Sequence, residues 1–214
     1  MDEEITIINE KTRNEKIKSF FIENKKILSS LVSLLIIIIL GFYSYQAYKD
    51  GHKKRVSEKY YSSVIEYNSG NKTFAIQSLK DIIKDKDNTY SPLALYFLID
   101  NNLIKNKEEV NNLFDILIDE TNLDYEIKNL IIYKKGLYNA DTIDENGLLN
   151  ILSPLINSKS IWKSHALYLA AEFFYFKNEK QKAKEFFEKI LTVENGNSSL
   201  KVEAQKKLNR DFSD

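Results

Sequence analysis

The feature that most constrains this chain is a run of 22 residues without a charged side chain, from Ile27 to Tyr48. Its centre, from Leu34 to Leu40, contains only leucine and isoleucine. As an α-helix the run would extend about 33 Å, which matches the hydrocarbon core of a bilayer. A helix that is apolar on every face has few places to be buried in a small domain. The run therefore predicts a transmembrane helix over residues 27–48.

Two alternatives compete with a transmembrane helix: a buried core helix and a cleaved signal peptide. The apolar run is longer than the core of a signal peptide, and residues 41–47 offer no small-x-small cleavage site. Phe42, Tyr43, Tyr45 and Tyr48 instead place aromatic side chains at one end of the run, which is typical of a membrane interface.

The basic residues that flank the run leave its orientation nearly balanced. Six lie within residues 11–26 and five within residues 49–59. Long domains are translocated largely regardless of charge, whereas a short tail is easily retained. We therefore expect a cytosolic tail over residues 1–26 and a domain over residues 49–214 outside the cytoplasm. The reverse orientation stays open on these grounds.

Composition excludes several classes of protein. The 31 basic residues equal the 31 acidic ones, and the balance holds on each side of the apolar run. No large basic face is expected, so we do not expect nucleic acid as a partner. The chain has no cysteine, which removes thiol catalysis, disulfides and cysteine-ligated metals.

After residue 48 the apolar residues recur three and four apart, which predicts an all-α domain. Polar and glycine-containing breaks divide this domain into helices. The breaks fall at residues 68–71, 85–88, 105–107, 120–122, 139–141, 157–159, 177–178 and 194–197. Ser91 followed by Pro92 predicts a helix N-cap and a proline in the first turn.

Alternate helices open on similar residues, which indicates an internal repeat. Ala75, Val110, Gly147 and Ala183 are 35, 37 and 36 residues apart, close to the period of about 34 in tetratricopeptide repeats. The last unit matches that repeat best, through Leu167, Ala170, Ala171, Phe174, Ala183, Phe187 and Ile190. We expect a tetratricopeptide-like α-solenoid of about four helix pairs, closed by a capping helix over residues 198–210.

The first unit departs from the repeat, because Ser62 and Ser63 stand where a large and a small residue are usual. In repeat geometry the first helix of each pair lines a concave groove. The predicted partner-binding positions are Tyr60 and Tyr67 in the first unit and His165, Tyr168, Glu172 and Tyr175 in the last. Tyrosines suit such a surface because they combine contact area with a hydrogen-bonding tip. The alternative is that they pack between neighbouring helices.

No cluster typical of an active site occurs in the sequence. His52 and His165 are the two histidines, and neither has a metal-binding partner at helical spacing. The carboxylates are interspersed with lysines, as on solvated helix faces. We therefore expect no catalytic residue, metal or cofactor, and a protein that is not an enzyme.

Three short segments carry a resemblance to a known family, together with the order of anchor and repeats. They are residues 20–26 (FFIENKK), 162–166 (WKSHA) and 200–204 (LKVEA). On these segments the chain resembles the YfgM-like family, ancillary subunits of the bacterial SecYEG translocon. The resemblance implies a cytosolic tail, an inner-membrane helix and a periplasmic repeat domain. It also implies translocon subunits, periplasmic chaperones or secreted polypeptides as partners.

The function expected from these features is a non-enzymatic, membrane-anchored scaffold that binds protein partners in the bacterial envelope. The second hypothesis is an envelope assembly or division factor that acts through lateral association of its membrane helix. An enzyme is the third.

Overall fold

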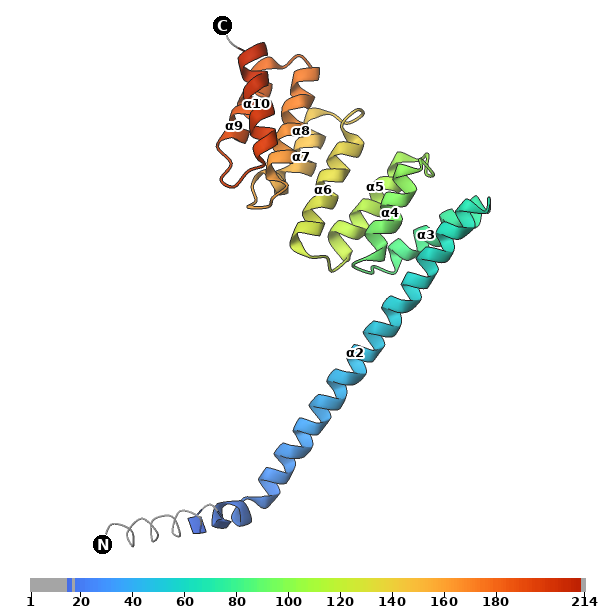
Figure 1. The fold of residues 1–214 in the computed structure, drawn as a ribbon, viewed down its shortest axis with the longest axis vertical. Coiled ribbons are helices and arrows are strands. Elements are labelled where there is room, and N and C mark those ends of the chain that lie inside the picture. Colours follow the sequence, from blue (N-terminus) through green and yellow to red (C-terminus); the bar gives the residue numbers. More distant parts are fainter. Residues whose placement is uncertain (1–14, 17, 213–214) are drawn as a thin grey trace, which may run out of the picture. The chain divides into compact units, whose positions relative to one another are not determined.

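The computed structural model describes residues 15–16 and 18–212, and within them the backbone forms helices and no β-strand (Figure 1). The prediction of an all-helical fold is thus confirmed. Most of the predicted tail over residues 1–26 lies outside the described residues, although residues 15–16 and 18–23 are helical.

The contacts divide the chain into two units, which meet between Arg55 and Val56. Helix α2, Lys25–Asn68, is the longest helix and contributes residues to both units. In the first unit, no side chain of its apolar window is buried. Within the described residues, α2 is the one helix long and apolar enough to cross a membrane. An uncovered apolar surface is stable in lipid and unfavourable in water, so α2 is a candidate membrane-spanning helix.

The second unit consists of consecutive helices joined by short turns (Figure 1). After the end of α2 these are α3 (Lys72–Lys84), α4 (Tyr90–Asp100), α5 (Lys107–Asp115), η1 (Ile116–Glu120), α6 (Tyr125–Asn139), α7 (Glu145–Ile156), α8 (Lys163–Phe176), α9 (Lys180–Leu191) and α10 (Ser198–Asp211). All eight breaks expected from the sequence fall at or beside the ends of these helices. The predicted capping helix corresponds to α10.

Four helical segments, α3, α5 with η1, α7 and α9, each bury three side chains spaced four and then three residues apart. Each of these side chains is at most 1% exposed: Ala75, Leu79 and Ile82; Val110, Phe114 and Leu117; Leu148, Leu152 and Leu155; Ala183, Phe187 and Ile190. The third unit therefore aligns on Leu148 and not on Gly147, the residue chosen from the sequence. The reason is that Gly147 belongs to the helix start, where its N–H is capped by Asp144 at 2.9 Å.

Counted from the first buried residue of each set, the spacing is 35, 38 and 35 residues, so one interval is three residues longer than the others. That interval contains η1, a π-helix that follows α5 directly. π-Helices commonly accommodate inserted residues within a helix. The insertion also coincides with a division of the core, because Ile131 on α6 belongs to the cluster with α3 and α4, and Ile132 to the cluster with α8 and α9.

The start of α4 differs from the prediction. The helix begins at Tyr90, one residue before the expected cap Ser91. Asp87 caps this end instead, since its carboxylate accepts from the backbone N–H groups of Thr89 at 2.9 Å and Tyr90 at 2.7 Å. The Ser91 hydroxyl is buried and donates to the carbonyl of Ile82 at 2.7 Å. Asp87 lies three residues before the start of α4 at Tyr90, so its carboxylate reaches the free N–H groups there. The Ser91 hydroxyl instead joins α4 to α3.

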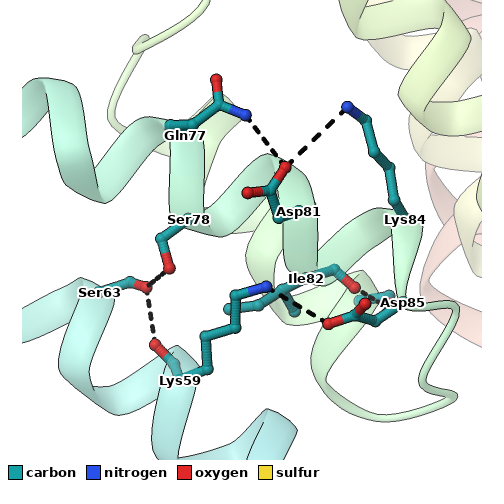
Figure 2. A network of polar contacts seen from close by, with 9 residues as sticks. Lys59, Ser63, Gln77, Ser78, Asp81, Ile82, Lys84 and Asp85 are labelled. Carbon is teal, nitrogen blue, oxygen red and sulfur yellow. Dashed lines mark hydrogen bonds and ion pairs between the residues drawn. The ribbon is translucent and has the colours of Figure 1, made fainter.

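Figure 2 shows why serine is accepted in the first pair where the repeat usually has a small apolar residue. Ser63 is fully buried, and its hydroxyl lies 2.7 Å from that of Ser78 on α3. Ser63 also donates to the carbonyl of Lys59 at 2.7 Å, so it accepts the proton of Ser78. At the edge of this contact, Lys59 forms an ion pair with Asp85 at 3.4 Å. Every polar group in the buried contact is therefore paired.

Candidate functional site

The four predicted groove positions of the last pair lie on α8, and two of them, Glu172 and Tyr175, contact α10 or the residue after it. Glu172 forms an ion pair with Lys207 at 2.9 Å. Lys207 also lies over the ring of Tyr175 at 4.7 Å, and Phe212 packs on the same ring at 6.0 Å between centroids. Tyr168 packs against Phe187 on α9 at 5.8 Å. This surface is partly covered by the chain's own C-terminal helix.

Burial raises the pKa of the Tyr168 hydroxyl, and the negative charge of Glu172 acts in the same direction. The phenol therefore stays neutral at physiological pH, as its ordinary pKa already requires. Tyr168 can donate a hydrogen bond but has no acid–base role near neutrality.

The two predicted positions in the first pair contact α4. Tyr60 packs against Tyr90 at 5.8 Å, and Tyr67 meets the edge of Phe97 at 5.2 Å. Both side chains are half-buried by these contacts. These contacts favour the alternative weighed from the sequence, in which tyrosines pack between neighbouring helices. They leave only part of each ring for a partner.

His165 lies in an aromatic cluster where α6 meets α8. Its ring centroid is 5.0 Å from that of Trp162 and 5.7 Å from that of Tyr133, and Tyr133 stacks on Trp162 at 5.9 Å. Burial lowers the pKa of His165 below its ordinary value, and the carbonyl of Ile161 partly opposes this shift. The imidazole is therefore neutral at pH 7, and its role here is packing.

The structure contains a cleft that sequence reasoning missed. It has a volume of about 600 Å³ and lies between the α7–α8 turn, residues 157–162, and the α9–α10 turn, residues 192–197. A smaller hollow beside it, about 190 Å³, is lined in part by Trp162 and His165. No sequence signal points to the cleft, because the turns are distant in the chain and neither carries a motif.

The remaining polar side chains form structural contacts. Among residues 15–16 and 18–212, no group of three or more histidine or acidic side chains is placed to hold a metal ion. Asn111 and Asn139 exchange two side-chain hydrogen bonds, at 3.0 and 2.8 Å, where α5 meets α6. Such paired amides fix the register of two helices. Their chemistry gives no reason to assign them a ligand.

We compared the chain with known proteins in three ways. No protein-family model matches it, and neither a curated protein nor a solved structure does. The fold and the site therefore have to carry any functional inference by themselves.

Proposed function

We propose that this protein is a non-enzymatic, membrane-anchored scaffold whose helical unit binds protein partners in the bacterial envelope. The observation that carries the proposal is the uncovered apolar stretch of α2, in one chain with a unit of successive packed helices. Helical arrays of this kind present extended surfaces that suit polypeptide partners.

The helical unit is proposed to be a tetratricopeptide-like solenoid. The support is the buried triad that recurs in α3, α5–η1, α7 and α9. In the last pair, all seven side chains matched to the repeat from the sequence are at most 1% exposed. Small residues such as Ala170 and Ala171 let α8 and α9 pack closely, as the repeat requires.

The specific partner proposed is the Sec translocon, with the helical unit in the periplasm linking secreted polypeptides to chaperones. This rests on the family resemblance of residues 20–26, 162–166 and 200–204. A photo-crosslinking amino acid at Phe176, whose side chain is 85% exposed, would be activated in native membranes. Translocon subunits among the crosslinked products are the expected result. Crosslinks that never include them would contradict this part of the proposal.

Topology is tested separately with a single cysteine, because the chain has none. Val202 on α10 is 53% exposed, so Val202→Cys presents a reachable thiol. We expect a maleimide that crosses only the outer membrane to label it in intact cells. Labelling that appears only after lysis would place the helical unit in the cytosol.

A second experiment distinguishes the scaffold from the competing hypothesis, an assembly factor that acts through its membrane helix. In this experiment residues 27–48 are exchanged for an unrelated span. The scaffold keeps its crosslinks after this exchange, since the span serves it only as an anchor. An assembly factor of the second kind loses its function.

A further inference from the structure

The cleft between the α7–α8 and α9–α10 turns is a built feature of the fold. The first turn is fixed to α6, because the Ser160 hydroxyl donates to the carboxylate of Glu126 at 2.6 Å. The second turn is fixed to α8, because the N–H of Asn197 donates to the Ser164 hydroxyl at 3.3 Å. A Cβ at Gly196 would lie 2.8 Å from that hydroxyl oxygen. The second turn can therefore approach α8 this closely only with glycine at this position.

The rim of the cleft is basic. Lys159, Lys163 and Lys189 line it, against a single acidic residue, Glu194. Lys159 and Lys163 form no ion pair with any of the described residues, unlike Lys182 on α9 and Lys207 on α10. Lys189 makes only a cation–π contact, with its ammonium 4.7 Å from the centre of the Phe186 ring. Three lysines that line one hollow favour an anionic ligand.

The floor of the cleft adds hydrogen-bond donors. Ser164 lines it although the residue is only 1% exposed. Its oxygen accepts from Asn197, and its own proton has no acceptor among residues 15–16 and 18–212. At the start of α8 the backbone N–H groups of Trp162 and Lys163 are already paired with the hydroxyl and carbonyl of Ser160. The buried Ser164 hydroxyl is therefore the donor left to meet an acceptor atom bound in the cleft.

The walls define which anion fits. Ile156, Ile161 and Val193 supply apolar surface, and Ile161 is 65% exposed. Asn195 provides an amide group able to pair with a peptide backbone, whereas the side-chain nitrogen of Asn157 already donates to the carbonyl and hydroxyl of Ser153. Glu194 reduces the positive charge, which favours a singly charged carboxylate over a doubly charged phosphate. A volume of about 600 Å³ is within the range of ligand sites.

We propose that this cleft binds the C-terminal carboxylate of a partner polypeptide whose last side chain is apolar. The carboxylate lies among the three ammonium groups and the Ser164 hydroxyl, and the side chain contacts Ile161. This inference rests on the proposed scaffold function and specifies the chemistry of its partner. It also places the contact at the turns, since α10 partly covers the groove positions of α8.

The test uses the full chain in nanodiscs of zwitterionic lipid and a dye-labelled pentapeptide, Ser-Gly-Ser-Ala-Leu, as the free acid and as the C-terminal amide. Fluorescence anisotropy should show the free acid binding at least about tenfold more tightly, as expected for a lost charge-assisted hydrogen bond. Equal affinity of acid and amide, or binding of neither, would overturn the proposal.

Variants assign the binding to the cleft. Lys163→Gln and Lys189→Gln should each weaken binding of the free acid. Lys180→Gln removes a charge from α9 outside the cleft lining and should leave binding unchanged. Thermal unfolding of each variant confirms that the fold is retained. Wild-type affinity in both cleft variants would refute the site.

A competition experiment separates the carboxylate from a phosphate group, such as that of a lipid headgroup. Acetate should displace the peptide at lower concentration than inorganic phosphate does, and the reverse order would reject the carboxylate. Because these measurements use the purified chain and a peptide, their failure leaves the crosslinking test of the scaffold function intact. Failure of the crosslinking alone leaves the peptide result standing.

Discussion

At the scale of single residues, the clearest test concerns the serine pair that joins α2 to α3. Ser63→Ala removes the acceptor of the buried Ser78 hydroxyl. We expect the free energy of unfolding to fall by about 1 kcal/mol, because a buried donor is left unpaired. Denaturant unfolding in detergent measures the change. The matched control is the exposed neighbour, Ser62→Ala, which should change stability by less than about 0.5 kcal/mol.

His165 gives a prediction for pH dependence. Its pKa is lower in the folded chain than the ordinary value, chiefly through burial. The unfolded chain therefore binds the extra proton first as the pH falls through about 6.5, and the free energy of unfolding decreases over that range. Above that pH the contribution is fully retained.

His165→Phe keeps an aromatic ring against Tyr133 and Trp162 but cannot titrate. Stability measured at about pH 7.5 and about pH 5.5 should fall less in this variant than in the wild-type chain. An identical decrease in both proteins would show that His165 does not contribute to the pH dependence.

At the scale of elements, the packing of α8 against α9 dominates the C-terminal core. Phe174 is fully buried and stacks on Phe186 with ring centroids 5.4 Å apart. Phe174→Ala should reduce the free energy of unfolding by about 3–5 kcal/mol, since it leaves a large cavity. Phe176 on the same helix is 85% exposed, so Phe176→Ala should change it by less than about 0.5 kcal/mol. Similar losses for both would show that α8 is not packed as described.

Element boundaries were well specified by local sequence, whereas the exact register was not. The eight breaks follow from glycine, asparagine and charged residues that interrupt the apolar period. The buried set on α7 begins at Leu148, one residue after the Gly147 chosen from the sequence, because Gly147 lies in the first turn, where Asp144 caps its N–H. No local feature of the sequence predicted the π-helix η1.

At the scale of the whole molecule, the candidate membrane span makes a direct prediction. A lysine at the centre of the run, Ile37→Lys, places a charge where insertion costs about 3 kcal/mol. Ser29→Lys, near one end, lets the ammonium reach the interface at smaller cost. We expect carbonate extraction to release more of the Ile37 variant than of the Ser29 variant. Equal retention of both would argue that residues 27–48 do not cross a bilayer.

The sequence by itself determined the apolar run, the helical period and the faces that each helix buries, because these depend on residues within a few turns of one another. The groove positions were also named from the sequence, but only the tertiary structure decided that α10 and Phe212 contact two of them, Glu172 and Tyr175. The basic cleft was invisible in the sequence for the same reason. Its lysines come from the α7–α8 turn, the start of α8 and the end of α9, and helix packing brings them together.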